Sequence, residues 1–271
     1  MHDLKICCLY SGSGGNCTYV EAGGAKILID AGKSAKNLCA ALCSIGVDIT
    51  EIDGILITHD HSDHTAALRT LSHKFDIPIY MLLSSAEIFR GLKDERLCAR
   101  LRLFRGCEFE TDIKGLHVKA FKTPHDSLAS VGYRLTYKGD DGCEVSLGFA
   151  TDTGHVTQEM LDGFKGCYAA IIESNHDLDM LRRGPYPIEL KERISSKYGH
   201  LSNTDCAALA TYIYEQGTRN IMLAHLSEEN NTPELAFNET FSALADESVN
   251  LKVAAPASPV WLVGADRTSD N

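Results

Sequence analysis

The stretch THDHSDH, residues 58–64, carries three histidines and two aspartates within seven positions. It directly follows the apolar run GILI at residues 54–57, which is typical of a short buried strand. Imidazole nitrogens and carboxylate oxygens are common ligands of divalent metal ions, so a turn of this composition can supply two adjacent ions. The candidate ligands in it are His59, His61, Asp63 and His64. The segment therefore predicts a metal centre at the end of a strand.

Three isolated ionisable residues further along also follow apolar runs that read as strands. They are His125 in TPHDS, Asp152 in ATDTG and His225 in LAHLS. Functional sites of α/β folds collect at the carboxyl ends of strands, so we expect these side chains to converge on the histidine cluster. Taken singly, each could instead be a capping or hydrogen-bonded polar residue.

Strand and helix patterns alternate along the chain. We expect strands at residues 5–9, 17–21, 25–30, 54–58, 77–81, 116–121, 131–137, 145–150, 169–172, 220–224 and, as the final strand, 251–254. Helices are expected at 34–45, 85–92, 156–163, 187–197, 204–216 and after the NTP sequence at 231–233. With no long linker or low-complexity segment, the pattern predicts a single layered α/β domain over residues 1–271.

The composition is that of a globular protein, with 44% hydrophobic residues. No run approaches the roughly 18 apolar residues of a membrane helix, and the N-terminal sequence lacks a signal-peptide profile, so we expect a cytoplasmic protein without a membrane partner. Ten cysteines are scattered without a Cys-x-x-Cys pair, which favours reduced, packed cysteines over a disulfide scaffold.

The formal net charge of −11 argues against a surface that binds nucleic acid as a whole. Two basic runs could still provide local contacts, although such runs are commonly solvated helix faces. The first run contains Arg90, Lys93, Arg96, Arg100, Arg102 and Arg105. The second contains Arg182, Arg183, Lys191, Arg193 and Lys197.

The histidine cluster resembles the HxHxDH signature of the metallo-β-lactamase superfamily, and the later His, Asp and His fall in that superfamily's order. The resemblance implies an α/β fold, the metallo-β-lactamase four-layer αββα sandwich, and two divalent ions. It implies one ion bound by His59, His61 and His125, a second bound by Asp63, His64 and His225, and Asp152 bridging both. Asp30, which ends the run ILID, would orient the ligand histidines. Zinc is the favoured ion, while manganese and iron stay open because His/Asp sites accept several metals.

Four further segments resemble the YycJ/WalJ family within that superfamily. They are SGSGGN at 11–16, ESNHD at 173–177, GPYP at 184–187 and GHLSN at 199–203. This resemblance implies a 5′-to-3′ exodeoxyribonuclease whose partner is DNA with a free 5′ end. It also implies mismatch repair as the process served, with mismatch-repair proteins as partners.

Phosphodiester hydrolysis suits such a centre. Two ions about 3.5–4 Å apart can hold a bridging hydroxide and clamp a phosphoryl oxygen during in-line displacement. The leaving sugar oxygen then needs a proton or a positive charge, for which His200 is the candidate. Asp63, one of the predicted metal ligands, is the second catalytic candidate. The side chains expected to contact the substrate are Ser11, Ser13, Asn16, Asn175, His176 and Ser202.

Two alternative functions remain at this point. A glyoxalase-type hydrolase of a small thioester or lactone would use the same ions to polarise a carbonyl, and an RNA-processing nuclease would share the GHLS motif. The twenty residues between Asp152 and Glu173 are too few for the long tRNA-binding arm of many tRNA-processing relatives. No β-CASP domain fits between Glu173 and His200. His200 separates the nucleases from a glyoxalase-type enzyme, which needs no histidine there.

Overall fold

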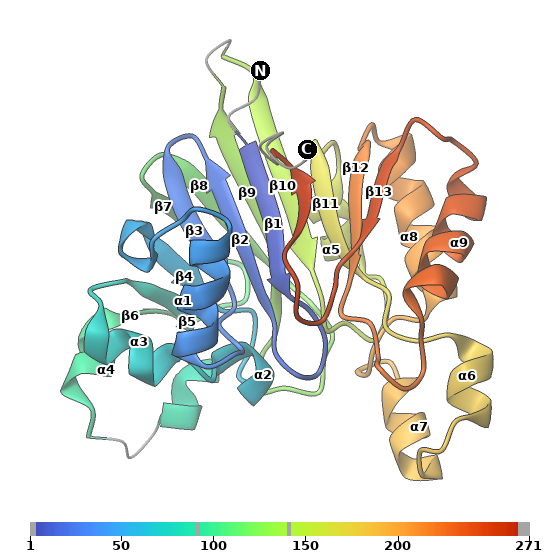
Figure 1. Ribbon diagram of the computed structural model, residues 1–271, viewed down its shortest axis with the longest axis horizontal. Coiled ribbons are helices and arrows are strands. Elements are labelled where there is room, and N and C mark those ends of the chain that lie inside the picture. The colour runs from blue at the N-terminus through green and yellow to red at the C-terminus, as the bar shows by residue number, and fades with distance from the viewer. Residues whose placement is uncertain (1–3, 90–92, 140–141, 265–271) are drawn as a thin grey trace.

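In the computed structural model, which describes residues 4–89, 93–139 and 142–264, two seven-stranded sheets pack face to face (Figure 1). The first sheet holds, in spatial order, β14 (Val260–Val263), β1 (Leu4–Tyr10), β2 (Cys17–Ala22), β3 (Ala25–Ile29), β4 (Gly54–Leu56), β5 (Ile79–Leu82) and β6 (Leu101–Phe104). The second holds β13 (Asn250–Val253), β12 (Asn220–Ala224), β11 (Ala169–Glu173), β10 (Glu144–Ala150), β9 (Val131–Lys138), β8 (Leu116–Lys122) and β7 (Glu110–Ile113). Apolar side chains of both sheets, such as Ile6, Ile27, Val118 and Leu147, form the core between them.

Helices cover the outer faces of both sheets and confirm the four-layer αββα sandwich (Figure 1). The helices on the first sheet are α1 (Ala35–Ser44), α3 (Leu68–Lys74) and α4 (Glu95–Arg100). Those on the second are α5 (Gln158–Phe164), α8 (Asn203–Glu215) and α9 (Pro233–Leu244). The short α2 (Ser62–Thr65) and the pair α6 (Leu178–Arg183) and α7 (Ile188–Ile194) lie at the lower edge in Figure 1, where strands of both sheets end.

Parallel pairing decides where the polar turns meet. In the first sheet β3, β4, β5 and β6 are parallel, and in the second β10, β11, β12 and β13 are parallel. Strands such as β11 (AAIIE) and β4 (GIL) are buried along their whole length, which explains their continuous apolar runs. Because the carboxyl ends of parallel strands share one edge, the residues that follow these strands are brought together.

Side-chain caps set the starts of several helices close to the predicted positions. Ser34, Thr157, Ser202 and Thr232 each accept a hydrogen bond from a backbone N–H in the first turn of α1, α5, α8 and α9. Each cap supplies a partner to one N–H that has no acceptor within the helix. These capping hydroxyls are the local sequence signal for the four helices.

Some predicted elements differ from the structure. The strand predicted at 251–254 is not the last one, because β14 follows it and pairs antiparallel with β1. The helix predicted at 85–92 is a 3₁₀ turn, Ser85–Phe89, and residues 90–92 lie outside the described residues. Sequence analysis missed the short or polar elements α2, α3, α4, α6, β6, β7, β14 and the 3₁₀ turn Ile49–Glu51.

None of the ten cysteines, all within the described residues, forms a disulfide, as expected. Cys43, Cys98 and Cys143 are nevertheless exposed, so packing in the core does not account for all of them. Across the described residues, no helix is both long enough and apolar enough to cross a lipid bilayer.

Candidate metal centre

The seven candidate ligands come together at the edge where strands of both sheets end. Four of them follow β4, while His125 follows β8, Asp152 follows β10 and His225 follows β12. In each of four groups, the possible ligand atoms lie within 4.8 Å of one another. The groups are His59 with His61 and His125, Asp63 with His64 and His225, His59 with His64 and Asp152, and Asp152 with Glu173, His200 and His225. The first two groups are the two ligand sets that the family resemblance implies.

The Asp152 carboxylate lies between the two sets. Its Oδ2 is 3.3 Å from Nε2 of His64, in one set. Its Oδ1 is 3.7 Å from Nε2 of His125, in the other set. The side chain is almost fully buried, with an exposed fraction of 3%. This position fits the bridging role that the family resemblance implies for Asp152.

Three residues of the centre have a left-handed backbone. The φ angles are 64° for Asp30, 56° for Asp152 and 58° for His225. Few L-residues adopt this conformation, although Asp and His are among those that tolerate it, and its strain is found at functional sites. Each residue lies just beyond the end of a strand, where the turn of the chain brings its side chain into the cluster.

Four histidines direct the same nitrogen, Nε2, into the centre, because each donates its Nδ1 hydrogen to a fixed acceptor. The acceptors are Thr58 Oγ1 for His59 (3.0 Å), Asp30 Oδ2 for His64 (2.8 Å), the Gly199 carbonyl for His125 (3.2 Å) and Glu173 Oε1 for His225 (2.8 Å). His61 differs and presents Nδ1, which lies 3.4 Å from Nε2 of His125.

Asp30 is buried directly behind the ligands. Besides His64, it accepts hydrogen bonds from the backbone N–H and the hydroxyl of Thr58. Since Thr58 in turn holds His59, Asp30 fixes two ligand rings, one directly and one through the threonine. This geometry fits the orienting role predicted for Asp30.

Several buried polar atoms have no hydrogen-bond partner within the described part of the chain. They include His59 Nε2, His225 Nε2 and Asp152 Oδ2, all aimed into the cluster. Unsatisfied buried polar atoms are rare in folded proteins, and a bound cation explains three of them at one place. Burial, reinforced by the neighbouring His64 and His125, holds the pKa of His59 well below its usual value, so the ring is neutral as a ligand must be.

The buried carboxylates of the centre stabilise positive charge on their neighbours, as the pKa of His64 shows. Burial alone would lower the pKa of His64, but Asp30 and Asp152 outweigh burial and raise that pKa well above its ordinary value. A proton on His64 thus balances the carboxylates when no metal is bound, and metal binding would displace it. The donor set of histidines and carboxylates therefore fits divalent metal ions.

Glu173, at the end of β11, is a functional residue to which sequence analysis gave no role. Its Oε1 accepts hydrogen bonds from Nδ1 of His200 and of His225, both at 2.8 Å. Its Oε2 accepts from the backbone N–H groups of Thr153 (2.9 Å) and Leu201 (3.1 Å). Burial would raise the pKa of this carboxyl, but the two histidines, His200 first, hold it well below its usual range. The available signal was its position, a lone charge closing the apolar run of β11.

His200 lies outside both ligand sets but beside them, with 20% of its side chain exposed. Burial lowers its pKa, and the charge and hydrogen bond of Glu173 outweigh burial to raise the pKa to about 9. With Nδ1 bound to Glu173, Nε2 is the nitrogen that remains for a substrate. A pocket of about 170 Å³ opens here, lined by His200 and His225 together with Ser13, Asn175 and Arg193.

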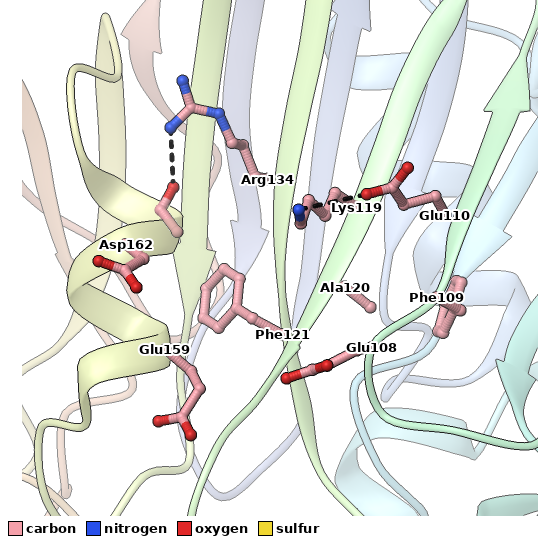
Figure 2. Close-up of a pocket in the computed structure, with 10 residues that line it drawn as sticks. Glu108, Phe109, Glu110, Lys119, Ala120, Phe121, Arg134, Glu159 and Asp162 are labelled. Carbon is pink, nitrogen blue, oxygen red and sulfur yellow. Dashed lines mark hydrogen bonds and ion pairs between the residues drawn. The ribbon is translucent and has the colours of Figure 1, made fainter.

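A larger cavity, of about 630 Å³, lies elsewhere, between α5 and strands β7 to β9 (Figure 2). Four carboxylates line it, and its two cations are engaged: Lys119 with Glu110, and Arg134 with the Gly163 carbonyl. None of the candidate ligands lines it. Its size therefore does not make it the reaction site.

The predicted substrate contacts divide into two groups. Ser13 is exposed and Asn175 lines the 170 Å³ pocket, so both can reach a ligand. The remaining residues have partners or burial within the protein: Ser11 Oγ accepts from the His225 N–H, Asn16 Nδ2 lies 2.9 Å from His64 Nε2, Ser202 caps α8, and His176 is 2% exposed. Ser11, Asn16 and Ser202 thus have partners within the protein, and contact of these residues with a substrate stays a prediction.

The two basic runs lie in different places. In the first run, the described residues lie in and around α4 and β6, the edge strand of its sheet, and Arg90 lies outside the described residues. The second run lies on and beside α6 and α7, and its Arg193 lines the pocket beside His200. The second run is therefore the one adjacent to the centre.

Comparisons with known proteins identify the family and the fold of this chain. Residues 25–226 match the family model described as "Beta-lactamase superfamily domain". The chain is 36% identical to exodeoxyribonuclease YycJ of Bacillus anthracis over 86% of both chains. It is 34% identical to exodeoxyribonuclease WalJ of Streptococcus pneumoniae over 92% of this chain and 91% of the relative. The metallo-β-lactamase fold protein YhfI of Bacillus subtilis, 16% identical, superposes with a TM-score of 0.71 over 95% of this chain and 99% of its own, which shows the shared fold.

Proposed function

Because this chain belongs to the metallo-β-lactamase superfamily, and within it to the family of the exodeoxyribonucleases YycJ and WalJ, we propose that it is a metal-dependent 5′-to-3′ exodeoxyribonuclease. Its substrate is DNA with a free 5′ end, and the process it serves is mismatch repair, as the family resemblance implies. The observation that carries the proposal is His200, which Glu173 holds in a pocket shared with the ligand His225. A proton donor at this place suits a departing sugar oxygen.

In this proposal the centre binds two divalent ions, zinc in the first place, through the two ligand sets with Asp152 shared between them. When bound, such ions supply a water activated near neutral pH and a positive clamp on the phosphoryl oxygens. The protein's own side chains orient the attacking water and donate a proton to the leaving oxygen.

Two side chains act on the reacting atoms. Asp63, whose side chain is 24% exposed, accepts a hydrogen bond from the attacking water and so orients it. His200 donates its Nε2 proton to the sugar oxygen as the phosphorus–oxygen bond breaks, while Glu173 holds the ring and stabilises its charged form. Glu173 is a positioning residue in this scheme, because it touches His200 and His225 and not the substrate.

The proposal is tested by incubating the purified protein with end-labelled single-stranded DNA, duplex DNA, RNA and a panel of thioesters, each with zinc, manganese, iron or a chelator. We expect DNA to be shortened from its 5′ end only when metal is present. Hydrolysis of thioesters with DNA left intact would assign the alternative, a small-molecule hydrolase. Preferential cleavage of RNA would assign an RNA-processing nuclease.

The basic run on α6 and α7 should guide the DNA backbone. Arg182 and Arg183 are 69% and 74% exposed, and we expect Arg182→Glu with Arg183→Glu to weaken DNA cleavage and to flatten its dependence on salt. Each lost phosphate contact should reduce the logarithmic salt slope by about 0.7 for a single strand and about 0.9 for a duplex. The matched control is Arg102→Glu with Arg105→Glu, in the first run. An equal effect of both pairs would show that only the total charge matters.

Glu173→Gln should uncouple His200 and His225 from their common acceptor. Both rings donate to the same oxygen, Oε1, so either orientation of the amide breaks contacts. An NH2 group at the Oε1 position removes the acceptor of both rings, and an NH2 group at the Oε2 position faces the backbone N–H groups of Thr153 and Leu201. We expect metal affinity and kcat each to fall by about 10–100-fold, as for other groups that orient metal ligands. Metal titration and steady-state kinetics measure the change, with the exposed Glu108→Gln as control. Unchanged metal affinity and unchanged kcat in Glu173→Gln would refute the positioning role.

A further inference from the structure

The pocket beside His200 has an apolar wall that the proposed reaction does not use. Tyr186, Leu190 and Ile194 line it, together with polar residues such as Ser13, Asn175 and Ser227. Leu190 and Ile194 lie one turn apart on α7, and Tyr186 precedes that helix by two residues. Phosphate transfer needs polar groups, so this wall must face another part of the substrate.

The wall is rigidly joined to His200. The backbone N–H of His200 donates to the Ile194 carbonyl at 2.9 Å, and Gly199 packs so closely on α7 that a Cβ there would lie 2.1 Å from that carbonyl oxygen. Arg193 Nε donates to Asp126 Oδ2, on the loop that carries His125. The wall is thus fixed relative to both the proton donor and a ligand.

The segment GPYP, residues 184–187, presents the tyrosine in a restrained backbone. Prolines on both sides limit the φ and ψ angles of this segment to extended values. Gly184 is required, because a Cβ at this position would lie 2.7 Å from both the Asn230 Oδ1 and the Met180 carbonyl oxygen. A ring held in this way loses little entropy when a ligand stacks on it.

The size of the pocket limits what can enter. Its volume of about 170 Å³ is below the range of about 300–1,000 Å³ for pockets that hold drug-sized ligands. One flat ring with an apolar face fits such a space, and aromatic side chains bind nucleobases by stacking without regard to sequence. Arg193 lies in the same lining, with its charge paired to Asp126, so the subsite rests on the apolar side chains.

We propose that Tyr186, Leu190 and Ile194 form a nucleobase subsite, which takes the base of a nucleotide flanking the cleaved bond. This inference rests on the proposed nuclease function and names the state of its substrate. A base can enter the pocket only when it has left the duplex stack, so the subsite selects strands whose 5′-terminal nucleotides are unpaired. It acts on any base, because stacking uses the π-face that all bases share.

The test pairs a protein change with a substrate change. Two end-labelled single strands are compared, one normal and one with abasic residues on both sides of the first cleaved bond. Tyr186→Ala should lower kcat/KM on the normal strand by roughly 5- to 150-fold and much less on the abasic strand. Tyr186→Phe keeps the ring and should retain cleavage of the normal strand. The control is Tyr198→Ala, at a 61% exposed tyrosine outside the pocket lining, which should affect both strands by the same factor.

A binding measurement in metal-stripped protein supplies an independent readout. The strand carries a fluorescent base analogue at its 5′ end. Its fluorescence should be quenched on binding to the wild-type protein and to Tyr186→Phe, but not on binding to Tyr186→Ala. Equal loss of cleavage on both strands, or quenching that persists in Tyr186→Ala, would overturn the nucleobase subsite. Absence of all DNA cleavage by the wild-type protein would instead refute the proposed function, and the quenching result would still decide the subsite.

Discussion

Asp152→Ala is expected to remove both metal ions and to abolish cleavage. The carboxylate lies between the two ligand sets, 3.3 Å from Nε2 of His64 and 3.7 Å from Nε2 of His125, and no other described carboxylate contacts both. Its loss removes the negative charge that lies beside both ligand sets, so each set binds a divalent cation more weakly. Without the ions the attacking water keeps its ordinary pKa of about 15.7, so activity should fall by several orders of magnitude.

Metal analysis of protein never exposed to chelator measures this outcome directly. The wild-type chain should contain two ions, and Asp152→Ala none, with activity not restored by metal in the assay. Asp162→Ala, at an exposed aspartate of α5, is the matched control and should keep full metal content. Full metal content in Asp152→Ala would contradict the bridging role of this carboxylate. A single ion in the wild-type chain would contradict the proposal of a dinuclear centre.

His200→Ala is expected to leave both ions bound but to slow DNA cleavage by about 10²–10⁴-fold, the usual effect of losing a positioned proton donor. A nitrophenyl phosphodiester, whose leaving oxygen hardly needs a proton, should be affected much less. Metal content and the two values of kcat/KM are measured on the same preparation. Glu173→Gln makes a useful companion, because it disturbs His200 without removing the ring.

The contrast between the two substrates decides the role of His200. An equal loss on DNA and on the nitrophenyl substrate would mean that the histidine binds phosphate and does not donate a proton. Loss of metal from His200→Ala would place the residue among the ligands, beside its neighbours Asp152 and His225. No loss on either substrate, together with normal thioester hydrolysis, would contradict the nuclease assignment itself.

The features that could be predicted from the sequence are those with a local signal. The histidine cluster follows a buried apolar strand, and the two facts together predict both the strand end and the chemistry. His125, Asp152 and His225 repeat the same pattern, a polar residue just after an apolar run. Serine and threonine caps mark the helix starts in the same local way.

The features that could not be predicted depend on distant partners. Glu173 is a single carboxylate whose importance comes from His200 and His225, which are 27 and 52 residues away along the chain. The hydroxyl of Ser202 caps α8 by accepting from the Asp205 N–H, a contact that depends on the tertiary placement of the helix start. The strands β6 and β7 have four residues each, β6 (LRLF) has no buried residue and β7 (ETDI) is mostly polar, so their pairing with β5 and β8 leaves little trace in hydrophobic periodicity.

The division of the ligands between the two sheets has a consequence during synthesis of the chain. Residues 59–64 leave the ribosome well before His225, because a protein is made from its N-terminus. A nascent first sheet therefore carries the histidine cluster without the ligands of the second sheet, and the centre is completed only when β12 has docked beside β11. Incomplete copies that end before β12 also lack His200's neighbour in the pocket. A chain that ends before β12 therefore lacks part of the candidate ligand set.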